Sequence, residues 1–317
     1  MKNTFSYQLY GLKVKSEMRI PELQETDQAD SDVEVSFGSC PAHLHPSTSS
    51  AWIEYQNNEC LIKIPGVARY HVFGSESIVI DRRTDRSRER GDGRPSSDIR
   101  LYLLGTAFAA IIYQRGLLPL HVGAVQAESG TWAFTGESGA GKSTLVAFLN
   151  RAFRLPIVTD DVAVITPSSG PVFLNSGPRR VKLWKNSMEA LGYPYCERDK
   201  DLTGHDKYQV TLPVTDINKR KPLVALVELA RASAKQRSGI IELSGVAAFS
   251  ACSRALYRPM MAQTLMSPNE LFAGIVDLGQ QIKVYRFTRE WCLSSIEQQC
   301  HSLIEIMNVG KATKASE

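Results

Sequence analysis

The segment TWAFTGESGAGKSTLVAFLNR, residues 131–151, decides the fold class of this chain. Its centre, residues 136–143, matches the pattern G-x-x-x-x-G-K-[S/T] at every fixed position. The preceding TWAFT has the β-rich, apolar composition of a buried strand, and the following STLVAFLNR has that of a helix. A strand, a glycine-rich loop and a helix in this order predict the phosphate-binding unit of an α/β domain.

Each fixed residue of this loop has a physical task. The glycines let the backbone curl so that several N–H groups point at phosphate oxygens. Lys142 brings a positive charge to the β- and γ-phosphates, Ser143 offers its hydroxyl to Mg²⁺, and the helix adds the positive end of its dipole. We therefore expect this loop to bind ATP with Mg²⁺ through Gly136, Glu137, Ser138, Gly139, Ala140, Gly141, Lys142, Ser143 and Thr144.

Two adjacent carboxylates, Asp160 and Asp161, follow in the apolar run LPIVTDDVAVI, residues 155–165. Adjacent side chains of a strand point to opposite faces, but both can reach one site where a strand ends. One carboxylate could then hold Mg²⁺ while the other accepts the proton of an attacking hydroxyl. The alternative is a surface turn that ends a strand.

A histidine and several basic residues are further candidates. His121 lies fifteen residues before Gly136 in LPLHVGAV, where a structural role is the alternative. Phosphoryl transfer needs cations beyond one lysine, since charge spreads over the transferred oxygens. In GPRRVKLW, residues 177–184, a strand would place Arg180 and Lys182 on one face. The other basic candidates are Arg179, Lys207 and Arg258, and ordinary surface charge is the alternative for all five.

The rest of the chain predicts a division into a β-rich N-terminal region and a mixed region. Short β-rich segments at 33–37, 51–55, 61–64, 70–73 and 77–80 indicate a small antiparallel sheet. The polar stretch 81–98 predicts a linker. After it, the pattern predicts helices at 99–115 and 142–152 and strands at 120–126, 131–135 and within 155–165. We expect an N-terminal region over 1–90, a catalytic domain over 91–309 and a polar tail over 310–317.

The overall composition is that of a soluble globular protein, with 43% hydrophobic and 22% charged residues in 317. The net charge is +4, but Lys and Arg are scattered, so no nucleic-acid partner is expected. Six cysteines without a C-x-x-C pair favour reduced thiols in the cytoplasm. No signal peptide is evident, and the apolar stretch 101–113 is too short to span a bilayer, so no membrane partner is expected. Self-association into a homo-oligomer stays open.

The segments LHVGAVQAESGTWAFTGESGAGKST, residues 120–144, and IVTDDVAVI, residues 157–165, together resemble the catalytic domain of HPr kinase/phosphorylase. That family has a histidine at the same distance before its loop and an Asp-Asp pair at the end of the next strand. The resemblance implies that Asp160 is the general base that deprotonates a serine hydroxyl, and that His121 assists it. Asp161 matches the acidic neighbour of that base, and Lys142 and Ser143 match the loop. With Asp160 as the base, we expect Ser143 and Asp161 to hold Mg²⁺, and Lys142, Arg180 and Lys182 to act as catalytic cations.

The downstream glycine-rich signature of the bacterial enzyme has no counterpart here, since GPRRVKLWKNSM, residues 177–188, stands in its place. The chain is more similar to HPr-kinase-like serine kinases that modify ribosomally made peptides, especially lasso-peptide precursors. The element RRVKLW corresponds to an Arg-x-Leu-Trp-like element of those kinases. Their opening pattern is matched by Tyr7, Gly11, Leu12, Ser16, Glu17, Pro21, Glu22 and Leu23.

This resemblance implies a peptide serine kinase that transfers the γ-phosphate of ATP, with the C-terminal serine of a lasso-type precursor as the acceptor. The implied fold is α/β, α+β overall: an HPr-kinase-like P-loop domain with a smaller β-rich N-terminal region. Two alternatives stay open. A small-molecule hydroxyl kinase would share the loop and base but have a tighter pocket, and a non-catalytic regulatory module would only change conformation on binding nucleotide.

Overall fold

The structure is a computed structural model that describes residues 4–45, 48–49, 52–83, 97–166, 170–178, 180–194, 207–211, 222–233 and 238–308. The fold is mixed α/β, as predicted, and the chain divides into two units. The first comprises Met1–Pro119 and Arg258–Leu271, and the second comprises Leu120–Tyr257 and Phe272–Glu317. The domain boundary predicted at residues 90 and 91 lies outside the described residues and stays a prediction.

An eight-stranded sheet in the order β1-β2-β3-β8-β7-β6-β5-β4 forms the first unit. Most neighbouring strands run antiparallel, but β2–β3 and β3–β8 are parallel, so the expected antiparallel sheet is wrong for these two pairs. Strand direction here depends on the connection over residues 17–32, which has no periodic pattern to read. The strands are β1 (Phe5–Leu9), β2 (Leu12–Ser16), β3 (Val33–Phe37), β4 (Thr48–Ser49), β5 (Ile53–Gln56), β6 (Glu59–Ile64), β7 (Ala68–Phe73) and β8 (Ser77–Asp81).

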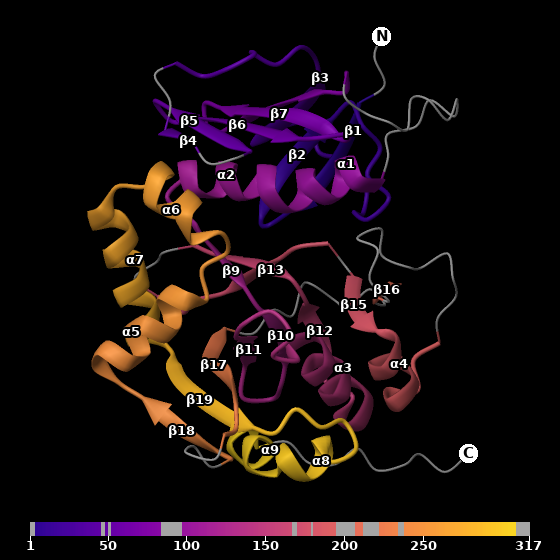
Figure 1. Ribbon diagram of the computed structural model, residues 1–317, viewed down its shortest axis with the longest axis vertical. Helices are drawn as coiled ribbons and strands as arrows, with labels where there is room; N and C mark the ends of the chain where they lie inside the picture. Colours follow the sequence, from indigo (N-terminus) through magenta and orange to yellow (C-terminus); the bar gives the residue numbers. More distant parts are fainter. Residues whose placement is uncertain are drawn as a thin grey trace. The chain divides into compact units, whose positions relative to one another are not determined.

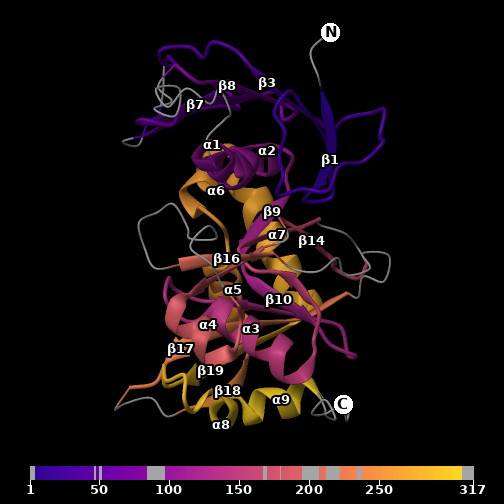
Figure 2. The same ribbon diagram turned by 90° about the vertical axis from the view of Figure 1, so that its right-hand side faces the viewer.

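Helices cover one face of this sheet (Figures 1 and 2). The predicted helix at 99–115 is present as α1 (Ser97–Tyr102), a π-helical turn η2 (Leu103–Ala107) and α2 (Phe108–Gln114). Two tyrosines of the sheet anchor it, because Tyr10 Oη donates to Leu104 O at 2.9 Å and Tyr70 Oη donates to Ile99 O at 2.9 Å. The helix α6 (Pro259–Leu265) packs against α2. These helices therefore belong to the first unit, although they fall within the range expected for the catalytic domain.

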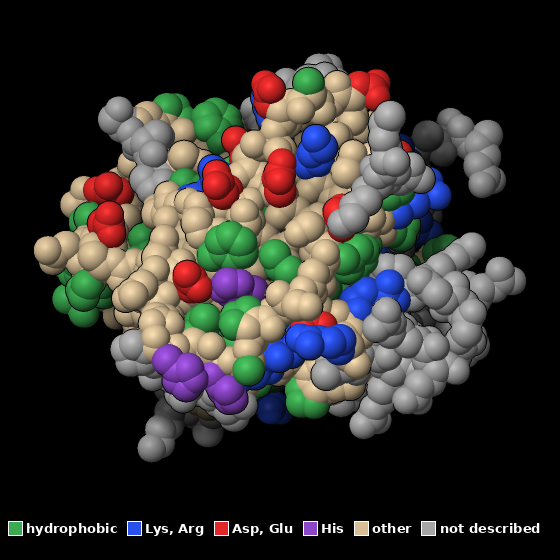
Figure 3. All heavy atoms as spheres, turned by 90° about the horizontal axis from the view of Figure 1, so that it is seen from above, with side chains coloured by type: hydrophobic (Ala, Val, Ile, Leu, Met, Phe, Trp, Pro, Cys, Tyr) green, Lys and Arg blue, Asp and Glu red, His purple; other side chains and the backbone are tan. Residues whose placement is uncertain are grey.

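The other face of this sheet is exposed to solvent over part of its area, and elsewhere Cys40 and Leu44 cover the buried Leu61. Along β7, buried and half-buried residues alternate, which is the pattern of a sheet with one covered face. Seen from above, acidic, basic and histidine side chains lie among hydrophobic ones, and neither sign of charge dominates (Figure 3). In the part of the chain that the structure describes, no helix is both long enough and apolar enough to cross a bilayer.

The second unit is built on a six-stranded sheet in the order β12-β10-β11-β17-β19-β18. Strands β11, β17 and β19 are parallel, and β10, β12 and β18 join by antiparallel pairs. The six are β10 (Gly123–Gln126), β11 (Thr131–Thr135), β12 (Ile157–Thr159), β17 (Leu223–Arg231), β18 (Gly239–Leu243) and β19 (Lys283–Arg289). Two small sheets add β14 (Leu174–Ser176), β13 (Val162–Ile165) and β9 (Leu118–His121), and β15 (Arg180–Trp184) with β16 (Lys207–Thr211).

Two of the predicted strands are each divided between two sheets. The segment 120–126 breaks at Val122 into β9 and β10, and the segment 155–165 breaks at Asp160 and Asp161 into β12 and β13. The first strand of one segment pairs with the second strand of the other, and at the two breaks Val122 N–H donates to Asp161 O at 3.2 Å. The two segments thus leave one sheet and enter the other side by side, which brings His121 next to the carboxylates.

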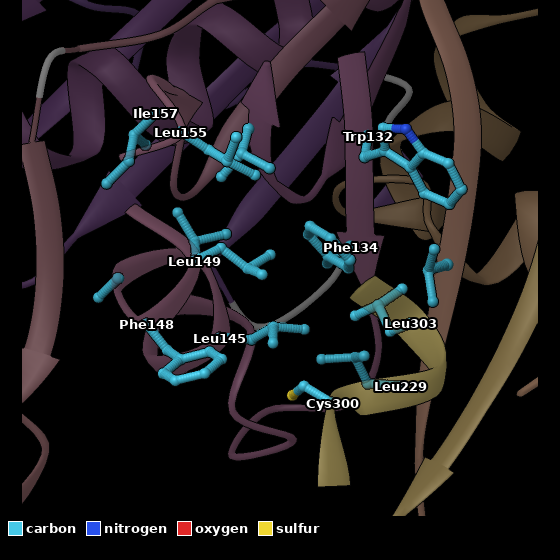
Figure 4. Close-up of a cluster of buried hydrophobic side chains, with 14 of the residues drawn as sticks. Trp132, Phe134, Leu145, Phe148, Leu149, Leu155, Ile157, Leu229, Cys300 and Leu303 are labelled. Atoms are coloured by element: carbon cyan, nitrogen blue, oxygen red, sulfur yellow. The ribbon is translucent and has the colours of Figure 1, made fainter. Parts of the chain in front are cut away.

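Helix α3 (Lys142–Phe153) begins directly after the glycine loop and packs on β10, β11 and β12. The remaining helices are α4 (Lys185–Leu191), α5 (Gly245–Arg254), α7 (Pro268–Gln281), α8 (Ile296–Gln299) and α9 (His301–Met307). The core around α3 is drawn in Figure 4 and includes Trp132, Phe134, Leu145, Phe148, Leu149, Leu155, Ile157, Leu229, Cys300 and Leu303. Burying one such leucine or phenylalanine stabilises the fold by about 1.5–3 kcal/mol, so the junction of β11 and α3 is held firmly.

Candidate nucleotide-binding site

The loop that joins β11 to α3 needs glycine at both of its ends. Gly136 has a φ of 146°, and a Cβ there would lie 2.9 Å from Leu229 O. Gly141 has a φ of 84°, and a Cβ there would lie 2.7 Å from Arg289 Nη2. Side chains at these two positions would both strain the backbone and collide with neighbours. The strand and helix predicted on either side of the loop are both present.

A cavity of ≈ 520 Å³ opens over this loop in the second unit. Lys142 is buried in its wall, and its Nζ donates to Gly136 O at 2.7 Å and to Glu137 O at 3.3 Å. A larger cavity of ≈ 1130 Å³ in the same unit has mostly apolar walls and contains none of the predicted site residues. The predicted chemistry therefore gathers in the smaller cavity, which is lined by His121, residues 138–144, Asp160, Asp161, Lys182, Trp184, Ser187, Arg289, Trp291, Cys292 and Leu293.

The adjacent carboxylates have opposite environments. Asp160 is buried, and its Oδ2 accepts the backbone N–H of Lys182 at 2.8 Å. Its Oδ1 is also buried and has no partner of good hydrogen-bond geometry among the described residues. Burial raises the pKa of Asp160 to about 7, although the Lys182 N–H and the nearby Ser143 hydroxyl act to lower this pKa. An unsatisfied carboxylate oxygen beside a hydroxyl fits a divalent cation.

Asp161 faces the cavity together with His121. The Asp161 side chain is 44% exposed and that of His121 is 37% exposed. His121 Nδ1 lies 3.1 Å from Asp161 O and 3.4 Å from Asp161 Oδ1. Both oxygens are acceptors, so Nδ1 carries the proton in this contact. Thr135 Oγ1 donates to His121 O at 3.2 Å, which ties the histidine to the end of β11. The resemblance had implied that His121 assists Asp160, whereas the histidine's contact in the structure is with Asp161.

The residues around the loop can accommodate Mg²⁺ and a phosphate chain. Mg²⁺ prefers oxygen ligands and is commonly held by one or two carboxylates together with substrate phosphates. Asp160 Oδ1 and the Ser143 hydroxyl are such oxygens. Within the described ranges, His, Cys, Asp and Glu form no group of three or more that could hold a metal by themselves. The donor set therefore suits an ion that binds together with the nucleotide.

The basic candidates separate into three groups. Lys182 lines the cavity because its strand neighbours Val181 and Leu183 are buried in the core, so Lys182 points the other way. Arg258 belongs to the first unit, where its guanidinium lies 4.9 Å from the centroid of the Trp52 ring, and it is not among the residues that line the cavity. The side chains of Arg180 and Lys207, and the whole of Arg179, lie outside the described residues.

Several wall residues were missed at the sequence level. Trp184 and Ser187 come from β15 and α4, and Thr144 Oγ1 lies 3.1 Å from Ser187 Oγ. Arg289 ends β19 and is followed by Trp291, Cys292 and Leu293. One signal was available, because ligands bind beyond the carboxyl ends of parallel strands, and KVYRFTR reads as a strand that ends on a cation. This signal could be used only if the strand at residues 283–289 was known to run parallel to β11, the strand before the loop.

No protein-family model matches this sequence. No curated protein matches it. Among solved structures, the HPr(Ser) kinase/phosphatase from Coxiella burnetii is similar to this chain, with a TM-score of 0.30 and 9% sequence identity, over 60% of this chain and 97% of that chain.

Proposed function

We propose that this protein is an ATP-dependent kinase that phosphorylates a serine hydroxyl of a peptide. The observation that carries the proposal is the pair of adjacent carboxylates with opposite exposure, one buried beside Ser143 and one facing the cavity beside His121. Phosphoryl transfer by this route needs one carboxylate at the metal and one at the attacking hydroxyl. The two environments supply these two functions at a single glycine loop.

We assign Asp160 to the metal rather than to the base. Asp160 Oδ1 and the Ser143 hydroxyl would hold Mg²⁺, which neutralises charge on the β- and γ-phosphates when it is bound. A buried carboxylate whose other oxygen accepts the Lys182 N–H is rigid, and rigidity suits a ligand. Lys142 would place its charge on the same phosphates. This assignment exchanges the functions expected from the sequence for Asp160 and Asp161.

We assign Asp161 as the general base. A base must come within hydrogen-bond reach of the hydroxyl it deprotonates, and Asp161 is exposed at the cavity wall. The serine proton passes to Asp161 as the serine oxygen bonds to the γ-phosphorus and the bond between that phosphorus and the β–γ bridging oxygen breaks, which releases ADP. His121, through Nδ1–H, would orient Asp161. Lys182 would add positive charge near the transferred group.

The choice of a peptidyl serine as acceptor is supported by sequence motifs. The opening pattern around Tyr7 and Gly11 and the element RRVKLW are similar to those of kinases that act on lasso-peptide precursors. The C-terminal serine of such a precursor is therefore the acceptor we propose.

The test is mass spectrometry of a serine-ended precursor peptide incubated with the protein, ATP and Mg²⁺. We expect a gain of one phosphate on the terminal serine, and none when that serine is replaced by alanine. Asp161→Asn should lower kcat about 10²- to 10⁴-fold, because an amide cannot accept the proton, while the Mg²⁺ requirement stays unchanged. Asp160→Asn should raise the half-saturating Mg²⁺ concentration about 10-fold or more, because a metal ligand is lost.

Two results would contradict this proposal. An Asp161→Asn variant with the parent kcat would rule out the base assignment. A protein that binds Mg²⁺·ATP but phosphorylates no serine-ended precursor peptide would rule out the peptide kinase. Small-molecule acceptors would then be tested, and a regulatory module would follow if none is phosphorylated.

A further inference from the structure

The order of strands in the six-stranded sheet separates the cavity into two flanks. The carboxylates follow β12, two strands from β11 on one side, and Arg289 ends β19, two strands from β11 on the other side. Strand β12 runs parallel to β11 because each is antiparallel to β10, so its carboxyl end lies at the same edge of the sheet as those of β11, β17 and β19. The glycine loop thus lies between an acidic flank and a flank made by residues 289–293.

Arg289 is a buried cation without a carboxylate partner among the described residues. It is 4% exposed, and burial lowers its pKa. Its contacts are weak and neutral: Nη1 donates to Glu290 O at 3.3 Å and to Gln299 Oε1 at 3.5 Å, and Nη2 donates to Ala140 O at 3.5 Å. Its Nε has no hydrogen-bond partner in the described chain. Burying an uncompensated charge is costly, so this site suits an anion.

Arg286, on the same strand, has a guanidinium charge that a carboxylate compensates. Arg286 Nε donates to Glu228 Oε2 at 2.9 Å, and Arg254 Nε donates to the other oxygen of Glu228 at 2.6 Å. These two guanidinium groups share a buried carboxylate, whereas Arg289, three residues after Arg286 and at the cavity wall, contacts no carboxylate in the part of the chain that the structure describes. A phosphate bound at Arg289 would remove this difference between the two arginines.

Beyond Arg289, the same flank becomes aromatic and apolar. Trp291 is 40% exposed in the cavity wall, and the Arg231 guanidinium lies 5.2 Å from the centroid of its ring. Cys292 and Leu293 continue this wall. An indole backed by a guanidinium and open to a phosphate-binding cavity is a stacking surface for a planar base.

We propose that residues 289–293 bind the nucleoside end of the nucleotide, with Arg289 paired to the phosphate nearest the ribose and Trp291 stacked on the base. The proposal rests on the proposed function in one respect, that this cavity takes a nucleoside triphosphate. Transfer requires the γ-phosphate at Asp161 and His121, on the acidic flank. The phosphate chain then crosses the loop, and the nucleoside comes to lie on the opposite flank.

Cys292 provides a test in the unaltered protein. Its thiol is exposed, and hydrogen bonds with Ser294 and Ser295 lower its pKa to about 7, so it reacts readily with iodoacetamide at neutral pH. Cys40, Cys60, Cys252 and Cys300 are buried and serve as internal references. Peptide mass spectrometry should show that saturating Mg²⁺·ATP slows Cys292 alkylation about 10-fold or more. Saturating inorganic triphosphate with Mg²⁺ should leave it within about 2-fold. Equal protection by both ligands, or by neither, would overturn the proposal.

Two variants separate the base from the phosphate. Arg289→Gln should weaken binding of ATP and of inorganic triphosphate alike, by about 10- to 100-fold, because a charged hydrogen bond is lost from both. Trp291→Leu should weaken ATP about 10-fold through lost stacking and leave inorganic triphosphate unchanged. Binding is measured by calorimetry without any acceptor. Lys283→Gln, which removes an exposed charge at the opposite end of β19, and Trp52→Leu in the first unit are the matched controls.

The midpoint of thermal unfolding without ligand shows whether the variants are folded. Arg289→Gln removes an uncompensated buried charge, so its midpoint should equal or exceed that of the parent, while the increase on adding Mg²⁺·ATP should shrink. Unchanged ATP affinity in both variants would contradict the proposal. None of these measurements uses an acceptor peptide, so a failure of serine phosphorylation would not contradict the nucleoside site. Equally, a failure of the nucleoside site would not contradict serine phosphorylation.

Discussion

At the scale of single residues, the site depends on the difference between Asp160 and Asp161. They are adjacent in the chain, yet one is buried with a pKa near 7 and the other is 44% exposed. Nothing in the letters TDDV distinguishes them. The difference arises because β12 enters one sheet and β13 another, so the chain turns between the two carboxylates. Their exposure therefore depends on strand pairing.

The buried carboxylate predicts a pH-dependent stability. The folded pKa of Asp160, about 7, lies above the pKa of an ordinary aspartate, about 3.9, so the folded state binds more protons than the unfolded state between about pH 4 and pH 7. Stability from this group is therefore lost as pH rises through that window and stays low above it. In EDTA, Asp160→Asn should be more stable than the parent at pH 8, by up to about 4 kcal/mol, with a smaller gain at pH 5.

Urea unfolding at the two pH values measures this difference. Asp161→Asn is the matched control, because it removes the same charge from the neighbouring, exposed position. It should show a much smaller gain, since burial, and not the Asp161 charge, is the largest cause of the raised pKa of Asp160. A gain at Asp160 that is equal at pH 5 and pH 8 would mean that the carboxylate does not titrate in this window.

At the scale of elements, the loop after β11 and the end of β19 constrain one another. Gly141 and Gly139 both have a positive φ, of 84° and 85°. A Cβ at Gly141 would collide with Arg289 Nη2, whereas a Cβ at Gly139 would meet no atom within 4 Å. Backbone strain is thus shared by the two positions, and the collision is confined to Gly141.

This contrast gives a prediction with its own control. Gly139→Ala should cost about 1 kcal/mol of stability through its left-handed backbone. Gly141→Ala should cost more and should weaken Mg²⁺·ATP about 10-fold or more, because Arg289 must move. Chemical denaturation and calorimetry on both variants and on Gly141→Ala combined with Arg289→Gln test this. If the double variant recovers none of the excess cost, the collision is not its cause.

At the scale of the whole molecule, the functional groups belong to one of the two units. Every described residue that lines the loop cavity lies within Leu120–Tyr257 or Phe272–Glu317. The first unit has its own helix-covered sheet. A ligand stabilises the folded unit that it binds, by about 2.7 kcal/mol when its concentration is 100 times its dissociation constant. We therefore expect the nucleotide to stabilise the second unit.

Hydrogen exchange should report this confinement. With saturating Mg²⁺·ATP, amides of β10, β11, α3 and the end of β19 should exchange about 10- to 100-fold more slowly, because the ligand holds the elements that form its site. Amides of β5 to β8 should be unaffected. Lys142→Ala, which removes the phosphate-binding charge, is the control and should lose the protection. Equal slowing in both units would show that nucleotide binding stabilises the first unit as well.

Much of the local structure was predictable from the sequence, because local composition and spacing encode it. The strand and helix around the glycine loop, the helix at 99–115 and most short strands of the first unit occur close to where the pattern predicts them. Of the site residues, the structure brings His121, Lys142, Asp160, Asp161 and Lys182 to one cavity. Arg289 and Trp291 were missed because they reach the loop only through the parallel pairing of β11, β17 and β19.

The sequence by itself determined that a glycine loop with a lysine and a serine joins a strand to a helix, since those residues are adjacent in the chain and their conformation follows from local sterics. Tertiary structure alone decided which carboxylate is buried, which one His121 contacts, and that the buried Arg289 lies against Gly141. It also decided that β3 runs parallel to β2 and to β8 in the first unit. Burial and strand pairing depend on residues far apart in the chain, and such contacts produce no periodic pattern in the sequence of either segment.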